Sequence, residues 1–338
     1  MKKLGVAIIG CGNIHKVHAD AVSESELGYL VCMADINKER VQASAQNYGC
    51  QWYLDYRQVL ENDLVDVVHI CTPHYLHAQM AMEAVRAGKH VLVEKPVAMN
   101  MGEVRQMVQE REKYNRHIGV CFQNRFNSAS LKAKELIDSG ALGPVIGVKG
   151  LVTWHRDRQY YAQGDWRGRF ATEGGGVLIN QSIHTLDLMQ WLAGSVKAVK
   201  GNVSTRLLGD VIEVEDTADA TLFFENGATG VFFATNCYTT DSPVEIEVHC
   251  EKARLRLING KLYVEQQGES DCIVDKDITN VNYKSYWGKG HADLIEAFYH
   301  GVLNDDPGSV ISVEEAAESL KIIDGIYKSS STGNKIFI

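Results

Sequence analysis

One lysine stands where a charged donor would act on a substrate. Lys95 lies in a Glu-Lys-Pro triplet that directly follows the short apolar run of residues 90–93. Its ammonium group is a compact positive charge with three donors, which would favour an alkoxide over the alcohol and polarise a carbonyl. The alternative is an ordinary surface lysine with a solvated head group. The position at a strand end favours the first interpretation, and we predict that Lys95 is catalytic.

A histidine in a glycine-rich stretch is the candidate proton acceptor. Three glycines at 174–176 lead into a helix expected from about residue 176 to 192, in which Asn180 and His184 are four residues apart and share a face. A neutral imidazole accepts a proton near pH 7 because its reference pKa is about 6.5. The alternative is a structural histidine in the core whose ring is hydrogen-bonded to the carboxylate of Asp187, three residues further on. From these residues alone both interpretations stay open.

A glycine loop follows the first apolar run, residues 4–9. Gly10 permits a tight turn, and Gly12 lets the backbone approach a pyrophosphate whose oxygens face the N–H groups of the next helix. The third position of this G-x-G-x-x-G pattern is His15, which predicts looser packing of the helix on the strand. Two further cofactor contacts are predicted within the loop, Asn13 and Ile14.

An acidic residue ends the second apolar run. Asp35 lies 23 residues beyond Gly12, where a carboxylate can accept hydrogen bonds from the adenosine ribose hydroxyls. It would also repel a 2′-phosphate, so NAD is favoured over NADP, although Arg40 is close enough in sequence to weaken the argument and is itself a predicted contact. The alternative is that Asp35 caps the helix that starts near Lys38.

The carboxyl ends of the other predicted strands belong to the same site. In open α/β sheets, ligands bind outside these ends, at one edge of the sheet. For the two histidines of this edge, a solvated position at the start of a helix is an equal alternative. The predicted cofactor contacts at this edge are Thr72, Pro73, His74, His77, Glu94 and Lys95.

The arrangement of the apolar runs predicts two domains. Short runs alternate with helical patterns through the first third of the chain, as in a parallel sheet with helices on both faces. Later strand-like stretches follow one another directly, which indicates a large, mostly antiparallel open sheet. We expect an α/β protein with a doubly wound Rossmann domain over residues 1–124 and a substrate-binding and oligomerisation α+β domain over residues 125–338. The last helix, residues 313–329, could instead pack on the first domain.

Composition excludes several classes of protein. The chain has 338 residues, 45% of them hydrophobic and 23% charged, which is typical of globular proteins. Its formal net charge of −9 and lack of long basic runs argue against nucleic acid as a partner. No apolar run approaches the roughly 20 residues that cross a membrane. The eight cysteines form no C-x-x-C pair, so we expect reduced thiols, no metal site and a cytoplasmic location.

Together these segments resemble the Gfo/Idh/MocA oxidoreductases, a family named for glucose–fructose oxidoreductase and inositol dehydrogenase. The resemblance covers nearly the whole chain and includes the glycine loop, the Glu-Lys-Pro triplet, residues 123–126 and residues 174–187. It implies NAD-dependent hydride transfer at a secondary hydroxyl of a sugar, cyclitol, glycoside or nucleotide sugar. Lys95 would be the catalytic lysine, with a cis bond to Pro96, and His184 the general base.

The resemblance also implies a homodimer or homotetramer and further site residues. Many members carry aspartate where this chain has Asn180, which would orient a hydroxyl but cannot ionise. The segment 160–168 is similar to the loop that meets cofactor and substrate; a packed aromatic loop is the alternative. The implied residues are Gln123, Trp166 and Arg167 for the cofactor and, more weakly, Arg125, Tyr160, Tyr161 and Tyr286 for the substrate.

Two other functions fit the same sequence. One is a non-catalytic NAD-binding sensor or structural protein, and the other is a reductase of another substrate class, acting on an imine or enone. The presence of both Lys95 and His184 favours alcohol chemistry. The substrate itself stays open, because the arginines near the predicted pocket either hold an anionic group or are solvated; they are Arg125, Arg156, Arg158, Arg167 and Arg169.

Overall fold

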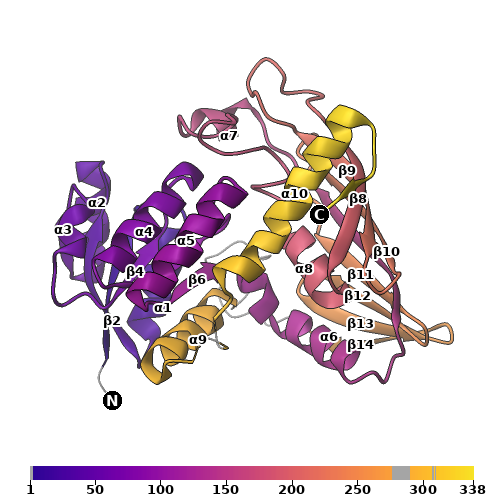
Figure 1. Cartoon of the computed structure of the whole chain (residues 1–338), viewed down its shortest axis with the longest axis horizontal. Coiled ribbons are helices and arrows are strands. Elements are labelled where there is room, and N and C mark those ends of the chain that lie inside the picture. The colour runs from indigo at the N-terminus through magenta and orange to yellow at the C-terminus, as the bar shows by residue number, and fades with distance from the viewer. Residues whose placement is uncertain (1–2, 276–289, 307, 309) are drawn as a thin grey trace. The chain divides into compact units, whose positions relative to one another are not determined.

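The computed structural model describes residues 3–275, 290–306, 308 and 310–338 (Figure 1). The chain divides into two compact units, one made of Met1–Gln123 and Gly290–Ala317, the other of Asn124–Lys289 and Glu318–Ile338. The expected division lay one residue later, after residue 124, and left the segment from Gly290 in the second domain. Tyr286, a predicted substrate contact, lies outside the described residues.

The first unit contains a six-stranded sheet in the order β3-β2-β1-β4-β5-β6, with every neighbouring pair parallel. The order reverses direction between β1 and β4, where the carboxyl ends of the strands open a crevice for a ligand. This is the predicted Rossmann arrangement, which is therefore confirmed. The strands are β1 (Leu4–Ile9), β2 (Gly28–Ala34), β3 (Gln51–Tyr53), β4 (Val67–Ile70), β5 (His90–Glu94) and β6 (Ile118–Cys121).

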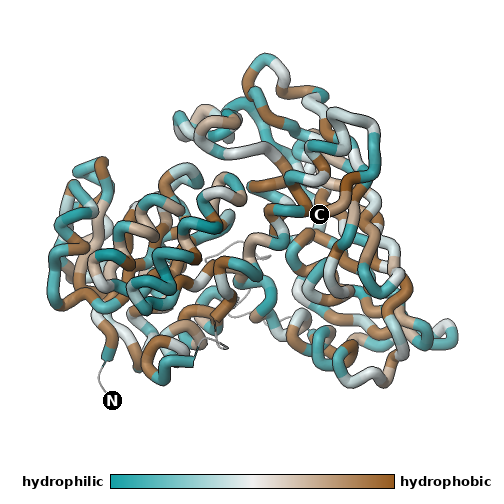
Figure 2. The backbone as a smooth tube through the Cα atoms, in the orientation of Figure 1, coloured by the Kyte–Doolittle hydropathy of each residue, from teal (hydrophilic) through white to brown (hydrophobic). Residues whose placement is uncertain are grey.

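The helices of the first unit cover the sheet, and all six residues of β1 are buried. Burial on both faces explains why the strands are continuous apolar runs. In Figure 2 the helices of this unit alternate between teal and brown, as expected for helices with one apolar face. They are α1 (His15–Glu24), α2 (Lys38–Tyr48), α3 (Arg57–Leu60), η1 (His74–Leu76), α4 (His77–Arg86), α5 (Met101–Tyr114) and α9 (Gly290–Asn304).

Helix α9 joins the first unit because it is strongly apolar on one side. Leu294, Phe298 and Tyr299 are buried in it. A Cβ added to Gly119 in β6 would lie 2.7 Å from the Phe298 ring, and one added to Gly28 in β2 would lie 2.8 Å from the Tyr299 ring. The late segment therefore completes the core of the first unit.

The second unit contains a nine-stranded sheet in the order β14-β13-β12-β11-β7-β10-β9-β8-β15. Strands β7 and β10 are parallel, and all other neighbours are antiparallel, which confirms the expected mostly antiparallel sheet. The strands are β7 (Val145–Thr153), β8 (Val196–Ser204), β9 (Thr217–Phe224), β10 (Thr229–Thr235), β11 (Glu245–Cys250), β12 (Arg254–Ile258), β13 (Lys261–Gln266), β14 (Glu269–Val274) and β15 (Ile336–Phe337).

Helices pack on one face of this sheet. A Cβ added to Gly150 in β7 would lie 2.4 Å from the Met189 sulfur of α8, so only glycine allows this close approach. The opposite face carries charged side chains, among them Lys149, which pairs with Glu245 at 3.3 Å and Glu247 at 3.0 Å. The helices are η2 (Gln123–Phe126), α6 (Ser128–Asp138), α7 (Arg158–Ala162), α8 (Ile183–Ala193) and α10 (Val313–Thr332), which starts in the first unit and continues in the second.

The helix expected from about residue 176 begins seven residues later, at Ile183. Residues 176–182 form turns instead, closed by hydrogen bonds such as Ser182 N to Val177 O at 2.9 Å. The backbone N–H groups of Gly176 and Leu178 donate to the buried carboxylate of Glu215, which holds them away from a helical path. Among the described helices, none is both long enough and apolar enough to cross a membrane.

Candidate active site

The glycine loop has the shape that a dinucleotide requires. Gly10 has φ +95°, and a Cβ there would lie 2.7 Å from the carbonyl oxygen of Cys71. This approach brings the loop against the end of β4. At Gly12 an added Cβ would meet nothing within 4 Å, so the space beside the backbone is open. These two observations fit a loop that receives a pyrophosphate at a helix N-terminus.

The third position of the glycine pattern is filled by a buried ring. His15 is 3% exposed, its Nδ1 contacts the carbonyl oxygen of Gly12, and its Nε2 lies 2.9 Å from the Ser44 hydroxyl on α2. Burial lowers the pKa of His15. The ring thus ties the loop to a second helix, while looser packing of the first helix on its strand stays a prediction.

Asp35 lies at the end of β2 beside the glycine loop. Its carboxylate accepts hydrogen bonds from the N–H groups of Cys11 and Asn37, both at 2.8 Å, and pairs with Arg40 at 3.5 Å. The cap of α2 is Asn37, whose side chain accepts from the N–H of Arg40 at 2.9 Å. The alternative that Asp35 is the cap was therefore wrong, and its position fits recognition of a ribose hydroxyl.

The loops after β4 and β5 are joined by a histidine. His77 Nδ1 lies 2.7 Å from the carbonyl oxygen of Pro96, and its Nε2 lies 2.8 Å from that of Thr72. His74 and His77 are both buried, so the alternative of solvated histidines was wrong. Burial lowers the pKa of His77, and a neutral ring donates to one of the two carbonyls at a time.

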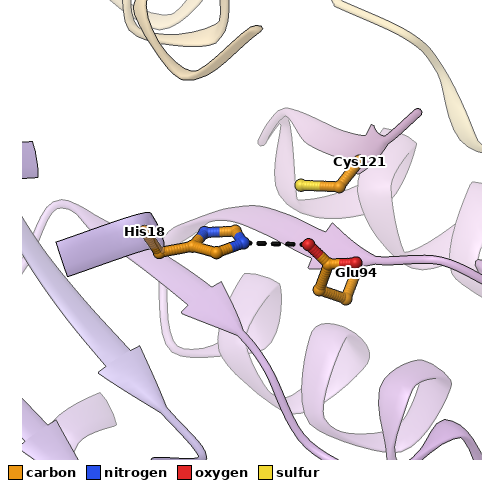
Figure 3. A group of neighbouring side chains, drawn as sticks. All are labelled: His18, Glu94 and Cys121. Carbon is orange, nitrogen blue, oxygen red and sulfur yellow. Dashed lines mark hydrogen bonds and ion pairs between the residues drawn. The ribbon is translucent and has the colours of Figure 1, made fainter. Parts of the chain in front are cut away.

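Glu94, the residue before Lys95, lies in a buried cluster with His18 and Cys121 (Figure 3). It accepts a hydrogen bond from His18 Nε2 at 2.9 Å, and His291 Nε2 lies 3.7 Å from the same oxygen. Burial by itself raises the pKa of Glu94, but the hydrogen bonds from His18 and His291 outweigh it and hold the pKa well below its ordinary value. Glu94 is therefore a buried carboxylate.

The cluster continues into the core through two further hydrogen bonds. His18 Nδ1 lies 3.0 Å from His69 Nδ1, and His69 Nε2 lies 3.0 Å from the Tyr299 hydroxyl. Burial holds the pKa of His69 well below its ordinary value, so this ring is neutral. A neutral His69 has one donor and one acceptor nitrogen, so it donates to one of its two neighbours, His18 and Tyr299, and accepts from the other. His18, His69 and Tyr299 were not among the predicted site residues; a histidine inside the apolar strand β4 was the available signal.

Cys121 also belongs to this neighbourhood. Its sulfur, His18 and Glu94 offer three ligand atoms within 4.8 Å of one another, the one such group among the described residues. Burial raises the pKa of the Cys121 thiol well above its ordinary value, whereas a metal ligand must be a thiolate. The proton of His18 is directed at Glu94, so the geometry fits a hydrogen-bonded cluster.

Lys95 follows β5 and precedes a cis peptide bond to Pro96, as the resemblance implied. Its positive charge contributes to the lowered pKa values of both His77 and His291, after the larger effect of their burial. Lys95 thus belongs to the same end of the sheet as Thr72 and Pro73. Gln123, a predicted cofactor contact, is buried directly after β6 at the next strand end.

In the second unit, Asn180 lies in the turns before α8, and His184 is the second residue of that helix. The argument that both share a helix face therefore does not apply to Asn180. Its Nδ2 donates to the carboxylate of Glu173 and lies 3.4 Å from the Tyr160 hydroxyl. Tyr160 also accepts from Gln181 Nε2 at 3.1 Å, so this tyrosine is joined to the glycine-rich segment.

Asp187 is engaged by an arginine. Arg125 donates to its two oxygens at 2.7 and 2.6 Å, and the Ser319 hydroxyl donates at 3.3 Å. Both members of the pair are buried, and a bidentate guanidinium–carboxylate pair is geometrically rigid. Arg125 was predicted as a weaker substrate contact; this pairing gives it a part in holding α8.

The predicted aromatic loop packs on itself. The Arg167 guanidinium lies 4.8 Å from the Tyr160 ring and 4.8 Å from the Trp166 ring, and Tyr160 meets Tyr161 edge to face at 5.0 Å. Arg167 is one of five arginines considered as ligands for an anionic group. The other four pair with carboxylates: Arg125 with Asp187, Arg156 with Asp241, Arg158 with Asp210 and Arg169 with Glu213. Among described contacts, only Arg167 is partnered by rings instead of a carboxylate.

Comparison with family models gives two matches. Residues 4–122 match a model described as an oxidoreductase family with an NAD-binding Rossmann fold. Residues 130–256 match the GFO/IDH/MocA C-terminal domain. The first match covers the six-stranded sheet, and the second covers β7 to β11 of the nine-stranded sheet.

Several known proteins are similar over most of their length. The chain is 31% identical to the uncharacterized oxidoreductase YrbE of Bacillus subtilis, over 72% of this chain and 71% of that protein. It is 27% identical to the D-glucoside 3-dehydrogenase of Escherichia coli K12, over 98% and 97%. The crystal structure of the WlbA dehydrogenase from Bordetella pertussis, in complex with NADH and UDP-GlcNAcA, superimposes with a TM-score of 0.85 at 27% identity and covers 100% of this chain and 99% of that one.

Proposed function

The chain belongs to the Gfo/Idh/MocA family of NAD-dependent oxidoreductases, and on that premise we propose that it oxidises a secondary ring hydroxyl of a D-glucoside or related sugar. The match of the first unit to the NAD-binding model, with Lys95 and His184 both present, carries the proposal. The sugar class is supported by the E. coli glucoside dehydrogenase, which aligns over almost its full length, and by the WlbA complex with a sugar nucleotide.

The first unit has the groups that NAD needs. Gly10 and Gly12 leave the loop open to a pyrophosphate, and Asp35 offers a carboxylate to the ribose. When bound, NAD supplies the acceptor for a hydride. We propose contacts to the nicotinamide half from Trp166 and Arg167. The other predicted contacts, Asn13, Ile14, Arg40, Thr72, Pro73, His74, His77, Glu94 and Gln123, remain part of this proposal.

Two side chains would divide the chemistry on the alcohol. As the ring carbon loses its hydride, His184 accepts the hydroxyl proton and Lys95 stabilises the negative charge that develops on the oxygen. The products are a ketone, NADH and a protonated imidazole, which balances two electrons and one released proton. Asn180 orients the hydroxyl without taking part in proton transfer, since an amide does not ionise.

A screen for NAD reduction tests this function. The panel contains methyl β-D-glucopyranoside, levoglucosan, myo-inositol, scyllo-inositol and UDP-GlcNAcA, with NADH absorbance as the signal. We expect turnover with the glucoside and its loss in Lys95→Ala, while NADH binding measured by fluorescence stays within about twofold. NADH formation from none of the five alcohols would contradict the proposal.

We also propose a cytoplasmic homodimer or homotetramer. The open face of the nine-stranded sheet carries apolar side chains beside its charged pairs, among them Ile146 at 59% and Val231 at 56% exposed. A second copy packed on that face would cover them. Light scattering should give a mass of two or four chains, and Val231→Lys should shift it towards one. A wild-type protein of single-chain mass would contradict this arrangement. The free thiols fit a reducing compartment.

A further inference from the structure

A buried carboxylate stands behind Asn180. Glu173 precedes the three glycines, is 1% exposed, and accepts a hydrogen bond from the N–H of Gly168 at 2.5 Å. Its other oxygen accepts from Nδ2 of Asn180. The reaction described above gives this carboxylate no part, although it contacts the residue that replaces the aspartate of many relatives.

The contact fixes the orientation of the Asn180 amide. An ionised carboxylate only accepts hydrogen bonds, so the end of the amide that faces Glu173 must be the NH₂ group. The carbonyl oxygen, Oδ1, is then the opposite end. Because a hydrogen bond to a charged group is roughly twice as strong as a neutral one, the carboxylate imposes this orientation firmly.

We propose that Glu173 is a positioning residue whose carboxylate holds Asn180 with its carbonyl oxygen as the acceptor for the substrate hydroxyl. This inference rests on the proposed function and deepens it. An alcohol donates a hydrogen bond through its O–H, whereas the ketone product only accepts. An Asn180 that presents an acceptor therefore favours binding of the alcohol.

The surroundings of Glu173 place its titration close to neutral pH. Burial, and to a smaller extent Glu215, raise the pKa of Glu173, whereas the hydrogen bonds from Gly168 and Asn180 and the charge of Arg167 lower it; the net pKa is about 7. The other titratable groups that sense it are Tyr161 and Tyr327. When protonated, the carboxyl can donate to Oδ1, and the amide can turn its NH₂ towards a ketone. Glu173 is then the group whose ionisation decides which end of the Asn180 amide faces the substrate.

Glu215 supplies a matched control. It is a second buried carboxyl of the same unit with a raised pKa, caused mainly by burial. Its partners are the N–H groups of Gly176 and Leu178 and the hydroxyl of Tyr327. None of these described partners is Asn180, and a glutamine still offers an oxygen to the N–H groups of Gly176 and Leu178. Glu215→Gln should therefore keep the orientation of the amide, while the loss of its charge lowers the pKa of Glu173.

The kinetic test is the pH dependence of kcat/KM for oxidation of methyl β-D-glucopyranoside. Wild type needs both His184 and Glu173 deprotonated, so log(kcat/KM) should rise with a slope approaching two on the acid side. Glu173→Gln should lower kcat/KM about tenfold, the loss of one charged hydrogen bond, and reduce the slope to one. Glu215→Gln should keep the slope of two. An unchanged slope in Glu173→Gln would overturn the proposal.

A reciprocal exchange sharpens the test. In the double variant Glu173→Gln with Asn180→Asp, an amide again faces a carboxylate, with the ionisable group now at position 180. The second ionisation should return to the pH profile. A merely structural role of Glu173 predicts no such return, and that result would count against positioning.

Infrared spectroscopy follows the carboxyl without any substrate. The protonated-carboxyl band present in wild type and absent in Glu173→Gln should disappear with a midpoint near pH 7. If Glu173→Gln does not fold, Asn180→Ala should move that band of the folded protein to higher pH by about one unit, because the amide donor is lost. A band that does not move, or a midpoint below pH 5, overturns the assignment.

The two proposals fail in different ways. If the band titrates as expected but no alcohol of the panel reduces NAD, the proposed function fails and takes the positioning role with it, while the buried ionisable carboxyl stands. If NAD is reduced and Glu173→Gln keeps the wild-type slope, the function stands and the role of Glu173 is rejected.

Discussion

Hydrogen bonds from histidines hold Glu94, the residue before Lys95, as a buried carboxylate. The cluster behind it runs from His18 through His69 to the Tyr299 hydroxyl. Burial lowers the pKa of His69, so this ring is neutral and joins the cluster with one donor and one acceptor nitrogen. A carboxylate adjacent to Lys95 in the chain is thereby kept ionised.

Asp35 provides a prediction about cofactor choice. In Asp35→Ser the ribose loses a charged acceptor, and repulsion of a 2′-phosphate disappears. We expect NADH to bind about tenfold more weakly and the preference over NADPH to shrink by a larger factor. Fluorescence titration with both cofactors measures this. Asp55→Ser, at an exposed aspartate, is the control and should change neither value. An unchanged ratio of NADH to NADPH affinity in Asp35→Ser would contradict recognition of the ribose by Asp35.

Local sequence patterns predicted strands better than the start of a helix. The apolar runs matched β1 and β5 because burial on both faces leaves a strong local signal. Residues 176–182 have helical periodicity but form turns, since Glu215, far away in sequence, takes their N–H groups. No local pattern reveals such a partner. Lys95 and His184 were predicted from motif context and stay predictions, and Glu173 was missed because it differs from an ordinary surface glutamate only through burial.

The glycine loop allows a paired prediction at the level of the element. Gly10→Ala places a Cβ 2.7 Å from a carbonyl oxygen at φ +95°, so both stability and NADH binding should fall. Gly12→Ala places a Cβ in open space, so the thermal midpoint should stay close to wild type while NADH affinity drops about tenfold or more. Scanning calorimetry and fluorescence titration separate the two effects. Normal NADH binding by Gly12→Ala would show that the pyrophosphate lies elsewhere.

At the scale of the whole chain, one late segment returns to the first unit. Gly290–Ala317 contributes Phe298 and Tyr299 to a core built mainly from the first 123 residues. The amphipathic pattern of α9 predicted a helix, but periodicity does not say which sheet will receive it. The division into two units therefore follows from packing between distant segments, whereas the class of each sheet followed from the order of local elements.

Buried histidines predict how stability depends on pH. Burial lowers the pKa of His90 to about 4, and it also lowers those of His69, His77 and His291. The unfolded chain protonates them near pH 6.5, so it binds more protons than the folded chain below that pH. Stability should therefore fall as the pH drops from 6.5 towards 4.

His90→Gln measures one share of that effect. At pH 5.5, one unit below the pKa of the unfolded state, keeping His90 neutral lowers the free energy of unfolding by about 1.4 kcal/mol. The variant has no group to protonate at this position and does not show this decrease. Urea unfolding at pH 7.5 and 5.5 should therefore show a smaller decrease for His90→Gln than for wild type. His300→Gln, on the exposed side of α9, should behave as wild type does. Equal decreases in all three proteins would contradict the assignment of a neutral His90.

Transfer of a hydrogen label tests the central claim most directly. Ring-deuterated methyl β-D-glucopyranoside is mixed with the enzyme and NAD for a single turnover, and the NADH formed is analysed by mass spectrometry. The account predicts that one deuterium moves from sugar carbon to NADH, and that Lys95→Ala and His184→Ala each slow this transfer by about 10² to 10⁴. NADH without deuterium, or transfer at the wild-type rate in both variants, would contradict it.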